Sequence, residues 1–492
     1  MYRIHVDTDT TLCDFKGTKI GINVNYITDG IHLIHQPRSI KDGLRELGVK
    51  FLRYPGGEKS DDYLWSTPPF EKPRPTLART GLPEIRPQFM PYIDDNYSSL
   101  KPCVMDFDQF MELCRDLECE PYIVVCYDSM FIPALPGGAI PTREQLYETA
   151  CAWVYYANIV KGYGIKYWEI GNESYVVAHH NGAKIVDYTR DIVDFAKGMK
   201  AIDPNIKILA NGPTGLDANE TPWGRMDEDK KKPWWATMLP VAAPWIDGIA
   251  FHDYPCFAWE SYDYYATQDV KIGDNVVDHL RSIIQTYCSQ EDASRISLAL
   301  TETHSADWST GKPNITRPGW NEDGTWGHAL VLFDMLGSYM RRSEVDSILV
   351  WNTRWVNATP ERVKSREGLY DFWDTLDIEN NLLPPGQVIK LWNDNLLDRM
   401  IKIDSIPGVV TFATASKTSD TLRVFIINKG YDLKSIQVML PDLGFKTAQH
   451  WCFSGKDALD TCPILKFLQD ILVENNTVTL ELVPVSITMI VF

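Results

Sequence analysis

The sequence lacks the segments that carry proteins into or across membranes. No uninterrupted apolar run approaches the ~20 residues that a transmembrane helix needs. The N-terminal stretch MYRIHVDTDTTL has no basic segment followed by a long apolar one, which an export signal requires. We therefore expect a cytoplasmic protein with no membrane partner, or a secreted one if a signal has been removed.

Positive charge is also scarce. The 48 lysines and arginines are outnumbered by 66 aspartates and glutamates, which gives a formal net charge of −18. Proteins that bind nucleic acids draw much of their affinity from clustered Lys and Arg, so the composition excludes nucleic acid as a partner. The one basic cluster, 230–232, directly follows three acidic residues and is interpreted as a solvated loop.

Cysteine patterns typical of metal sites are missing. The ten cysteines include no CxxC pair and have no histidine nearby at zinc-ligand spacing. Cys126 and Cys151 fall inside apolar stretches, where a free thiol behaves as a small buried hydrophobe. We expect thiols rather than disulfides, no metal and no cofactor.

Strand and helix patterns, in contrast, alternate regularly from about residue 20 to about residue 400. Short β-rich runs followed by amphipathic helical stretches are typical of parallel strands with crossover helices. The candidate strands are Ile20–Asn25, Phe51–Tyr54, Tyr122–Tyr127, Lys166–Gly171, Ile206–Asn211, Gly248–His252, Ser297–Thr301 and Ser347–Trp351. Eight consecutive units favour a closed (β/α)8 TIM barrel over an open sheet.

The chain is longer than a barrel requires. Its 492 residues exceed the usual barrel by roughly 150 to 250 residues. From Gly408 onward, short strands separated by Gly, Pro, Asn and Asp turns indicate an antiparallel β-sandwich, and the opening YRIHVDTD alternates in the same way. We predict a strand in 1–18 that joins the sandwich, a barrel over 19–400 whose eighth helix is Gln387–Met400, and the sandwich over 401–492.

Long loops are expected after the second, sixth and seventh strands, at 58–103, 253–274 and 303–325. Loops that follow strands lie at the C-terminal face of a barrel, where active sites are built. Two carboxylates reach this face at strand ends. KYWEIGNES ends the fourth strand with Glu173, and LALTETH ends the seventh with Glu302.

The spacing of the two carboxylates fits a barrel mouth. Glu173 and Glu302 are 129 residues apart, or three successive units, which places them on opposite sides of one cleft. Retaining glycosidases need two carboxyl groups ~5 to 5.5 Å apart, one to attack the anomeric carbon and one to protonate the leaving oxygen.

These motifs resemble the clan A retaining glycoside hydrolases, which carry Asn-Glu at the end of strand four and Glu at the end of strand seven. Within the clan, FLRYPGG at 51–57, WEIGNE at 168–173 and the appended sandwich look most like the α-L-arabinofuranosidase family. The β-xylosidases and heparanase-like β-glucuronidases are close behind. The sequence departs from the arabinofuranosidase pattern in Thr303–His304 and in the loop after Gly57.

The resemblance implies a role for each matching residue. Glu302 is the nucleophile and Glu173 the general acid/base, so Glu302 should have a low pKa and Glu173 a raised one. Arg53 should keep Glu302 ionised, and Asn172 should hold the sugar 2-hydroxyl. The residues expected to support the nucleophile or to stack on the sugar are His252, Tyr254 and Trp351.

Further candidates come from expected loops. Trp65 and Trp308 are interpreted as sugar-stacking residues of the rim, because aromatic faces pack on sugar rings. Asp62 is interpreted either as a contact to sugar hydroxyls or as a turn residue. Glu169 points into the barrel and is interpreted as part of a satisfied polar network.

We therefore predict a retaining glycoside hydrolase that acts on a plant, algal or bacterial oligosaccharide or polysaccharide, arabinofuranosidase-like in type. β-Xylosidase and β-glucuronidase activities stay open within the hydrolases, and a transglycosylase or a non-catalytic carbohydrate-binding barrel is the rival outside them. The sequence leaves open the sugar, its anomeric configuration, internal or terminal cleavage, and the oligomeric state.

Overall fold

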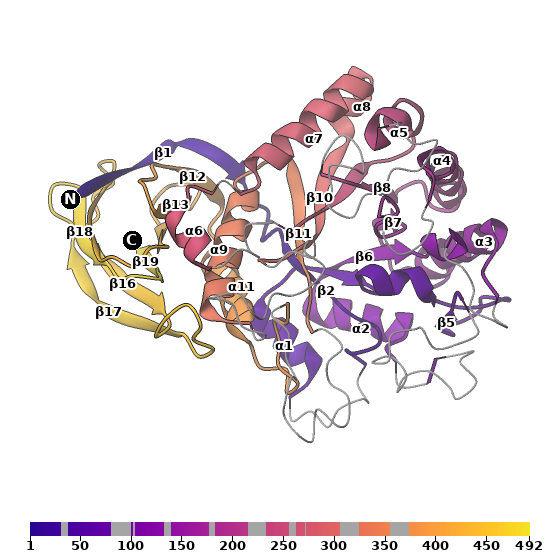
Figure 1. Ribbon diagram of the computed structural model, residues 1–492, viewed down its shortest axis with the longest axis horizontal. Coiled ribbons are helices and arrows are strands. Elements are labelled where there is room, and N and C mark those ends of the chain that lie inside the picture. Colours follow the sequence, from indigo (N-terminus) through magenta and orange to yellow (C-terminus); the bar gives the residue numbers. More distant parts are fainter. Residues whose placement is uncertain are drawn as a thin grey trace.

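A computed structural model of the chain describes residues 1–30, 38–79, 100–101, 104–131, 139–176, 183–214, 233–254, 262–270, 272–305, 324–354 and 373–492. A helix-ringed barrel lies beside a sheet domain that holds both chain ends (Figure 1). Among the described residues, no helix combines the length and apolar character needed to span a membrane.

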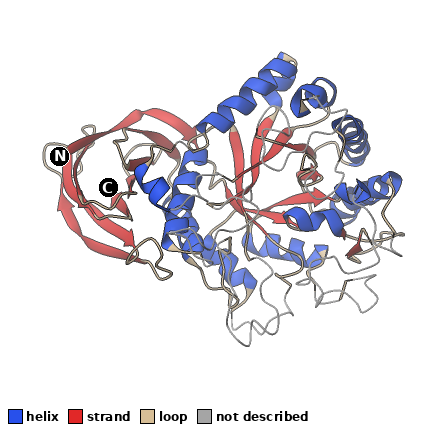
Figure 2. Ribbon diagram, in the orientation of Figure 1, coloured by secondary structure: helices blue, strands red, loops and turns tan. Residues whose placement is uncertain are grey.

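The barrel is closed by eight parallel strands in the order β10-β11-β2-β3-β6-β7-β8-β9. Their bounds are β2 (Ile20–Asn23), β3 (Phe51–Tyr54), β6 (Glu120–Val125), β7 (Tyr167–Ile170), β8 (Lys207–Gly212), β9 (Gly248–Asp253), β10 (Ser297–Thr303) and β11 (Val345–Val350). All eight predicted strands are present, and the predicted TIM barrel is confirmed. Helices surround the barrel strands (Figure 2).

Several helices begin or end at capping residues. Asp106 and Thr142 each form a capping box with a glutamine three residues later, at the starts of α2 and α3. Gly48 ends α1 in the left-handed conformation. The helices are α1 (Ile40–Leu47), α2 (Phe107–Leu117), α3 (Arg143–Val154) with its π-helical continuation η4 (Tyr155–Val160), α4 (Ile185–Ile202), α5 (Trp234–Ala242), α6 (Tyr262–Thr267), α7 (Asp274–Tyr287), α8 (Gln290–Arg295), α9 (Trp326–Met340) and α11 (Pro384–Asn395).

Short elements fill the loops at the C-terminal face of the barrel. The 3-10 helix η1 (Gly57–Asp62) follows β3 and leads into the small hairpin β4 (Tyr63–Leu64) and β5 (Thr76–Leu77). A second 3-10 helix, η3 (Asp128–Phe131), follows β6. These elements position side chains beside the strand ends that carry the carboxylates.

The sheet domain is a nine-stranded sheet in the order β17-β16-β19-β14-β13-β12-β1-β15-β18. Neighbouring strands are antiparallel except β1 and β15, which are parallel. The bounds are β1 (Tyr2–Asp14), β12 (Arg399–Ile403), β13 (Val409–Ala415), β14 (Leu422–Asn428), β15 (Lys434–Met439), β16 (Thr447–Ser454), β17 (Ile464–Leu472), β18 (Thr477–Leu482) and β19 (Ser486–Val491). The N-terminal strand thus lies between β12 and β15.

The end of the eighth barrel helix differs from its prediction. The helix expected over Gln387–Met400 ends at Asn395, and Arg399 already belongs to β12. The helix ends because β12 pairs with β1 and β13, which satisfies the backbone groups of this segment within the sheet. The apolar residues of Leu396–Ile403 suit a strand as well as a helix, so periodicity alone could not separate them.

Candidate active site

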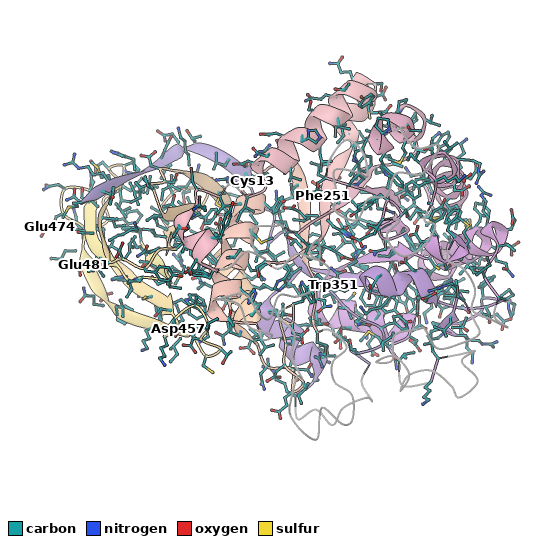
Figure 3. The ribbon with its side chains drawn as sticks, in the orientation of Figure 1. Cys13, Phe251, Trp351, Asp457, Glu474 and Glu481 are labelled. Carbon is teal, nitrogen blue, oxygen red and sulfur yellow. The ribbon has the colours of Figure 1, made fainter. Side chains whose placement is uncertain are left out.

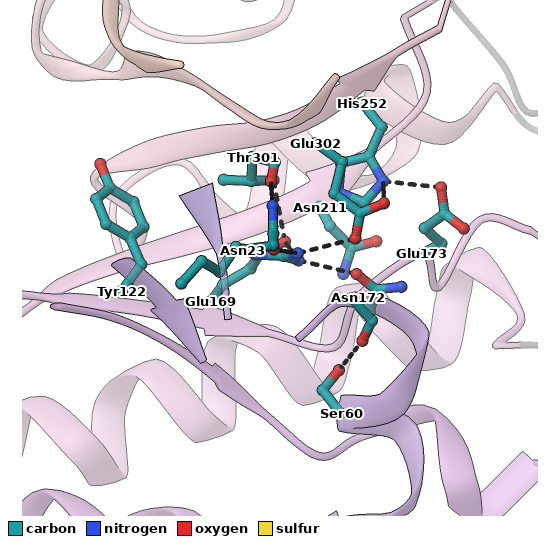
Figure 4. A network of polar contacts seen from close by, with 12 residues as sticks. Asn23, Ser60, Tyr122, Glu169, Asn172, Glu173, Asn211, His252, Thr301 and Glu302 are labelled. Carbon is teal, nitrogen blue, oxygen red and sulfur yellow. Dashed lines mark hydrogen bonds and ion pairs between the residues drawn. The ribbon is translucent and has the colours of Figure 1, made fainter. Parts of the chain in front are cut away.

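Five polar side chains meet at the C-terminal ends of the barrel strands. Arg53 is near the end of β3, Asn172 and Glu173 follow β7, His252 is near the end of β9, and Glu302 is near the end of β10. Figure 4 shows Asn172, Glu173, His252 and Glu302 grouped around one space. In the register between β9 and β10, Glu302 lies directly beside His252. The predicted site residues of these strands are therefore brought together.

Arg53 is the centre of a buried network. Its side chain has no exposed surface, and it makes a double contact with Glu169, Nε–Oε2 at 2.9 Å and Nη2–Oε1 at 3.0 Å. Nη1 also donates to Glu302 Oε1 at 2.9 Å and Nη2 to Asn172 Oδ1 at 2.8 Å. Burial opposes the charged form of Arg53, but the carboxylates of Glu169 and Glu302 outweigh it and raise the pKa.

Arg53 has one further partner that sequence reasoning missed. Nη1 donates to Asn23 Oδ1 at 2.8 Å, and the Asn23 amide donates to the carbonyls of Thr301 and Val350. An amide inside an otherwise apolar strand could have indicated this role. Asn23 ties the guanidinium to the strand that carries Glu302.

Glu302 is held from both sides. Arg53 donates to Oε1, and the Tyr254 hydroxyl donates to Oε2 at 3.0 Å. His252 Nδ1 lies 3.5 Å from Oε2. The predicted low pKa of Glu302 is wrong in direction, because burial raises the pKa by more than His252 and Arg53 lower it. The position of Arg53 could be predicted from sequence, but the depth of burial could not.

Glu173 has the environment of a general acid. Burial among protein atoms and the negative charge of Glu58 raise its pKa to about 7, although Arg53 and the Tyr175 hydroxyl oppose the shift. Its side chain keeps 32% of its surface exposed, so the carboxyl group stays open to the cleft. The raised pKa agrees with the prediction, whereas Glu58, which directly follows the Gly-Gly pair, was missed.

His252 bridges the two carboxylates. Nδ1 lies 2.8 Å from Glu173 Oε1 and 3.5 Å from Glu302 Oε2. Burial lowers the pKa of His252, so the imidazole is neutral near pH 7. A neutral ring can donate a hydrogen bond from Nδ1 to an ionised Glu173 or accept one there when Glu173 is protonated.

Hydrogen bonds to Asp128 fix the turn that carries Asn172 and Glu173. Gly171 has φ +73°, and a Cβ there would lie 2.4 Å from Ser174 Oγ and 2.7 Å from Asp128 Oδ2, so glycine is required. Asp128 Oδ2 accepts hydrogen bonds from the backbone N–H of Asn172 at 3.2 Å and from Ser174 Oγ at 3.0 Å. Burial raises the pKa of Asp128 to about 6. Asp128 was not among the sequence candidates.

Trp351 and Gly57 close the site beside Glu302. A Cβ on Gly57 would come within 2.3 Å of the Trp351 ring and 2.5 Å of Glu302 Oε1. Lys59 Nζ lies 4.8 Å from the centre of the Trp351 ring. Trp351 is 2% exposed and lies within the barrel (Figure 3), so it is placed near the nucleophile but offers little free surface in this structure.

Trp65 was predicted to stack on sugar, and the structure corrects this. Trp65 is fully buried, donates from Nε1 to the Thr149 carbonyl at 3.0 Å, and stacks on Trp153 of α3. The chain after β3 folds back against the helix layer instead of standing at the rim. Trp308 lies outside the described residues.

Asp62 is not directed at an open cleft. Arg79 holds its carboxylate in a forked pair, with Nε and Nη2 at 2.6 and 2.7 Å from the two oxygens. Burial raises the pKa of its neighbour Asp61, and the negative charges of Asp128, Asp62, Glu58 and Glu173 add to the shift. The turn interpretation of Asp62 fits this placement better than a sugar contact.

Glu173, His252 and Glu302 are also the residues that could hold a cation. One ligand atom from each lies within 4.8 Å of the others, and they form the one such group of three found in the described part of the chain. However, Arg53 and Tyr254 already donate to the two oxygens of Glu302, and the buried guanidinium repels a cation. The arrangement suits proton transfer and nucleophilic attack better than metal binding.

The chain is similar in sequence to known arabinofuranosidases. Residues 43–254 match the model for the alpha-L-arabinofuranosidase 1 domain. An intracellular exo-alpha-(1->5)-L-arabinofuranosidase of Acetivibrio thermocellus is 24% identical over 308 residues, which cover 58% of this chain and 53% of that protein. Alpha-L-arabinofuranosidase C of Emericella nidulans is 27% identical over 239 residues, 44% of this chain and 40% of that protein. The chain thus spans about half the length of these relatives.

Solved structures share the fold along the whole chain. The alpha-L-arabinofuranosidase of Thermotoga maritima in its arabinose complex matches with a TM-score of 0.70 and 17% identity, covering 100% of both chains. The family 51 alpha-L-arabinofuranosidase AbfB of Bifidobacterium longum matches with a TM-score of 0.69 and 16% identity, covering 100% of this chain and 99% of the other. The solved structures show that the chain has the fold of these enzymes, and the match of residues 43–254 to the arabinofuranosidase domain supports the resemblance predicted from the strand-end motifs.

Proposed function

We propose that this chain hydrolyses glycosidic bonds with retention of configuration, with Glu302 as the nucleophile and Glu173 as the general acid/base. The observation that carries the proposal is the close approach of the two groups: one oxygen of each lies within 4.8 Å of the other. Retaining enzymes hold their carboxyl groups ~5 to 5.5 Å apart, whereas inverting enzymes need roughly 6.5 to 9.5 Å to admit a water molecule.

The first chemical step uses the different surroundings of the two carboxyls. Glu302 attacks the anomeric carbon while Glu173 gives its proton to the departing oxygen, which forms a glycosyl ester on Glu302. Arg53 and Tyr254 each occupy one oxygen of Glu302 and thereby orient it for attack. A pKa of about 7 leaves Glu173 with a proton to donate near neutral pH.

The second step reverses the role of Glu173. Once Glu302 is esterified it carries no charge, so the repulsion between the two carboxyls disappears and ionisation of Glu173 becomes easier. Ionised Glu173 then takes a proton from water, which attacks the anomeric carbon and releases the sugar. Neutral His252, 2.8 Å from Glu173, can exchange donor and acceptor roles between the two steps.

For the substrate, we propose a terminal α-L-arabinofuranosyl group. The support is the match of residues 43–254 to the arabinofuranosidase domain and the names of the relatives from Acetivibrio thermocellus and Emericella nidulans. The hydrogen bond from Arg53 to Asn172, at 2.8 Å, supports a role for Asn172 in contacting a hydroxyl next to the reacting carbon. The natural substrate would then be an arabinose-bearing oligosaccharide or polysaccharide.

The test begins with 4-nitrophenyl α-L-arabinofuranoside, compared with the β-xyloside and β-glucuronide. We expect arabinofuranoside cleavage, with NMR showing that the first product has the configuration of the substrate. Glu302→Gln should lower kcat by at least about 10⁴-fold without unfolding the protein, as loss of a nucleophile does. Glu112→Gln, on the exposed surface of α2, is the matched control and should keep full activity.

Other outcomes would assign another function. An inverted product would contradict the roles given to both carboxylates. Binding of arabinan with no turnover in the unmodified protein, tolerant of Glu302→Gln, would indicate a carbohydrate-binding barrel. Sugar transfer that exceeds hydrolysis when an acceptor sugar is abundant would indicate a transglycosylase.

A further inference from the structure

Glu173 has a second hydrogen-bond partner beside His252. Tyr175, two residues further along the turn after β7, donates from its hydroxyl to Glu173 Oε1 at 3.3 Å. The backbone N–H of Val176 donates to the Glu173 carbonyl at 2.7 Å and closes the turn, so that Tyr175 lies inside it. Tyr175 was not among the sequence candidates, and its place two residues after the predicted acid was the one signal that could have indicated it.

The Tyr175 side chain is fixed in place and remains a hydrogen-bond donor. It is 4% exposed, and its ring meets that of Trp234 of α5 edge to face, with centres 6.2 Å apart. Burial and the negative charges of Glu173 and Glu302 raise the pKa of Tyr175 well above its ordinary value. The hydroxyl therefore keeps its proton near neutral pH and can donate a hydrogen bond to Glu173 in both steps of the reaction.

Both hydrogen-bond partners of Glu173 lie on the same carboxyl oxygen. His252 Nδ1 is 2.8 Å from Oε1, the atom that also accepts from Tyr175. Within the residues that the structure describes, Oε2 has no hydrogen-bond partner, and part of the side chain stays open to the cleft. Figure 4 shows one Glu173 oxygen joined to His252 and the other without a contact to the residues drawn. Oε2 is therefore the oxygen that can meet a substrate.

The other carboxyl group of the site is held differently. Glu302 has one donor on each oxygen, Arg53 on Oε1 and Tyr254 on Oε2. Donors on both oxygens suit a nucleophile, because they stabilise and orient its ionised form. A general acid has to release a proton from one oxygen, and that oxygen must reach the leaving group. The placement of both Glu173 partners on Oε1 meets this requirement.

We propose that Tyr175 is a positioning residue for Glu173: its hydroxyl holds Oε1, so that Oε2 is the oxygen that protonates the leaving group and later takes a proton from water. This inference rests on the proposed function of Glu173 as the general acid/base. It adds the atom through which Glu173 acts and the residue that directs this atom to the substrate.

The hydroxyl also has an electrostatic effect on Glu173. The charged and titratable groups around this carboxyl are Arg53, Glu58, Asp61, Asp128, His252 and Glu302. Burial and the charge of Glu58 raise the pKa of Glu173, whereas Arg53 and the hydrogen bond from Tyr175 lower it. By stabilising the ionised form, Tyr175 supports the second step, in which Glu173 acts as a base.

Tyr175→Phe removes the hydroxyl and keeps the ring beside Trp234. Two substrates separate positioning from a general structural effect, because the leaving oxygen of α-1,5-linked arabinobiose needs a proton, whereas 4-nitrophenolate leaves readily without one. We expect Tyr175→Phe to lower kcat/KM for the disaccharide by about tenfold, a part of the about 10²- to 10⁴-fold that a general acid contributes. For 4-nitrophenyl α-L-arabinofuranoside, kcat/KM should change less than about twofold, because this step depends little on the acid.

Tyr156→Phe is the matched control. Tyr156 is also 4% exposed, and its hydroxyl donates to a carboxylate oxygen, that of Asp108 of α2, at 2.8 Å. This hydrogen bond joins η4 to α2 and has no contact with Glu173. Both kcat/KM values should therefore stay as in the unmodified chain.

A second measurement does not depend on turnover. NMR of the chain with labelled glutamate carboxyl carbons follows the titration of Glu173, whose signal is identified by its absence in Glu173→Gln. Loss of a donor to the ionised form should move the titration midpoint to higher pH in Tyr175→Phe and leave it in place in Tyr156→Phe. If the unmodified chain cleaves neither substrate, the proposed function fails, and the titration still decides the role of Tyr175. An unchanged ratio of the two kcat/KM values in Tyr175→Phe, or an unmoved Glu173 midpoint, would overturn the inference.

Discussion

At the scale of single residues, Arg53 explains how Glu302 is held in place beside Asn172. It contacts Glu169, Glu302 and Asn172 with no exposed surface of its own. Sequence motifs, through the resemblance that they carry, predicted the contact between Arg53 and Glu302 but not the hydrogen bond between Arg53 and Asn172. They could not give the direction of the Glu302 pKa, since that depends on how completely the assembled loops exclude water.

The environment of the carboxyls predicts the pH dependence of kcat/KM. Catalysis needs ionised Glu302 and protonated Glu173. Activity should fall on the alkaline side with a midpoint near pH 7, where Glu173 loses its proton, and on the acid side with a midpoint above the ordinary Glu value of 4.5. The check is a pH–rate profile with an aryl arabinofuranoside.

Glu58→Gln should shift the alkaline limb of that profile. The negative charge of Glu58 disfavours ionised Glu173 and thereby raises its pKa, so removing the charge should move the alkaline limb to lower pH. Glu112→Gln, far out on α2, should leave the profile unchanged. An alkaline limb that stays in place in Glu58→Gln would contradict the electrostatic assignment.

Gly57 should be intolerant of any side chain. A Cβ would lie 2.3 Å from the Trp351 ring and 2.5 Å from Glu302 Oε1, so Gly57→Ala must displace one of them. Displacing a catalytic group by ~1 Å can reduce the rate about 100-fold, and we expect a loss of that size in kcat/KM. Gly162→Ala is the control, because Gly162 also has a positive φ, +65°, but nothing lies within 4 Å of its Cβ position. Equal kcat/KM in the two variants would show that contact with the nucleophile is unimportant.

At the scale of elements, strand positions were predictable and strand ends were less so. The barrel could be predicted from eight β-rich runs. Each barrel strand is covered on both faces and is therefore apolar along its length. β12, β16 and β17 were not among the predicted strands. The residues of β12 merged with the helical pattern before them, and β17 is apolar on exposed positions, which is opposite to the rule that alternation follows burial.

The 3-10 helix η3 also supplies a prediction at this scale. Asp128 in η3 accepts from the Asn172 backbone and from Ser174, and so supports the turn after β7. Asp128→Ala should lower kcat about tenfold with little change in KM. Losing these hydrogen bonds should destabilise the conformation of the turn by about 1 to 3 kcal/mol, and about 1.4 kcal/mol corresponds to a tenfold change in rate. Asp128→Asn keeps an acceptor oxygen and should restore most of the activity. If Asn behaves like Ala, the carboxylate charge rather than hydrogen bonding is what supports the turn.

At the scale of the whole molecule, barrel and sheet share one apolar core. Trp392 of α11 stacks on Phe333 of α9 at 4.4 Å and lies 4.6 Å from Phe425 of β14. One continuous cluster of buried residues runs from the barrel strands through α9 and α11 to β14 and β19. Sequence composition indicated two domains but not this union, because side chains far apart in the chain create it.

A shared core predicts that the two parts unfold together. Trp392→Ala removes a fully buried ring from the junction and should lower the free energy of unfolding by about 3 to 5 kcal/mol. Because the ring contacts both parts, the barrel and the sheet should keep a single common transition in denaturant, shifted to lower concentration. Circular dichroism and tryptophan fluorescence, followed on the same samples, measure this unfolding transition.

Trp245→Ala is the control. Trp245 is 37% exposed, so its replacement should lower the free energy of unfolding by less than about 1 kcal/mol. Two separate transitions in the unmodified chain, with Trp392→Ala moving only one, would show that barrel and sheet are stable independently and that the junction merely joins them.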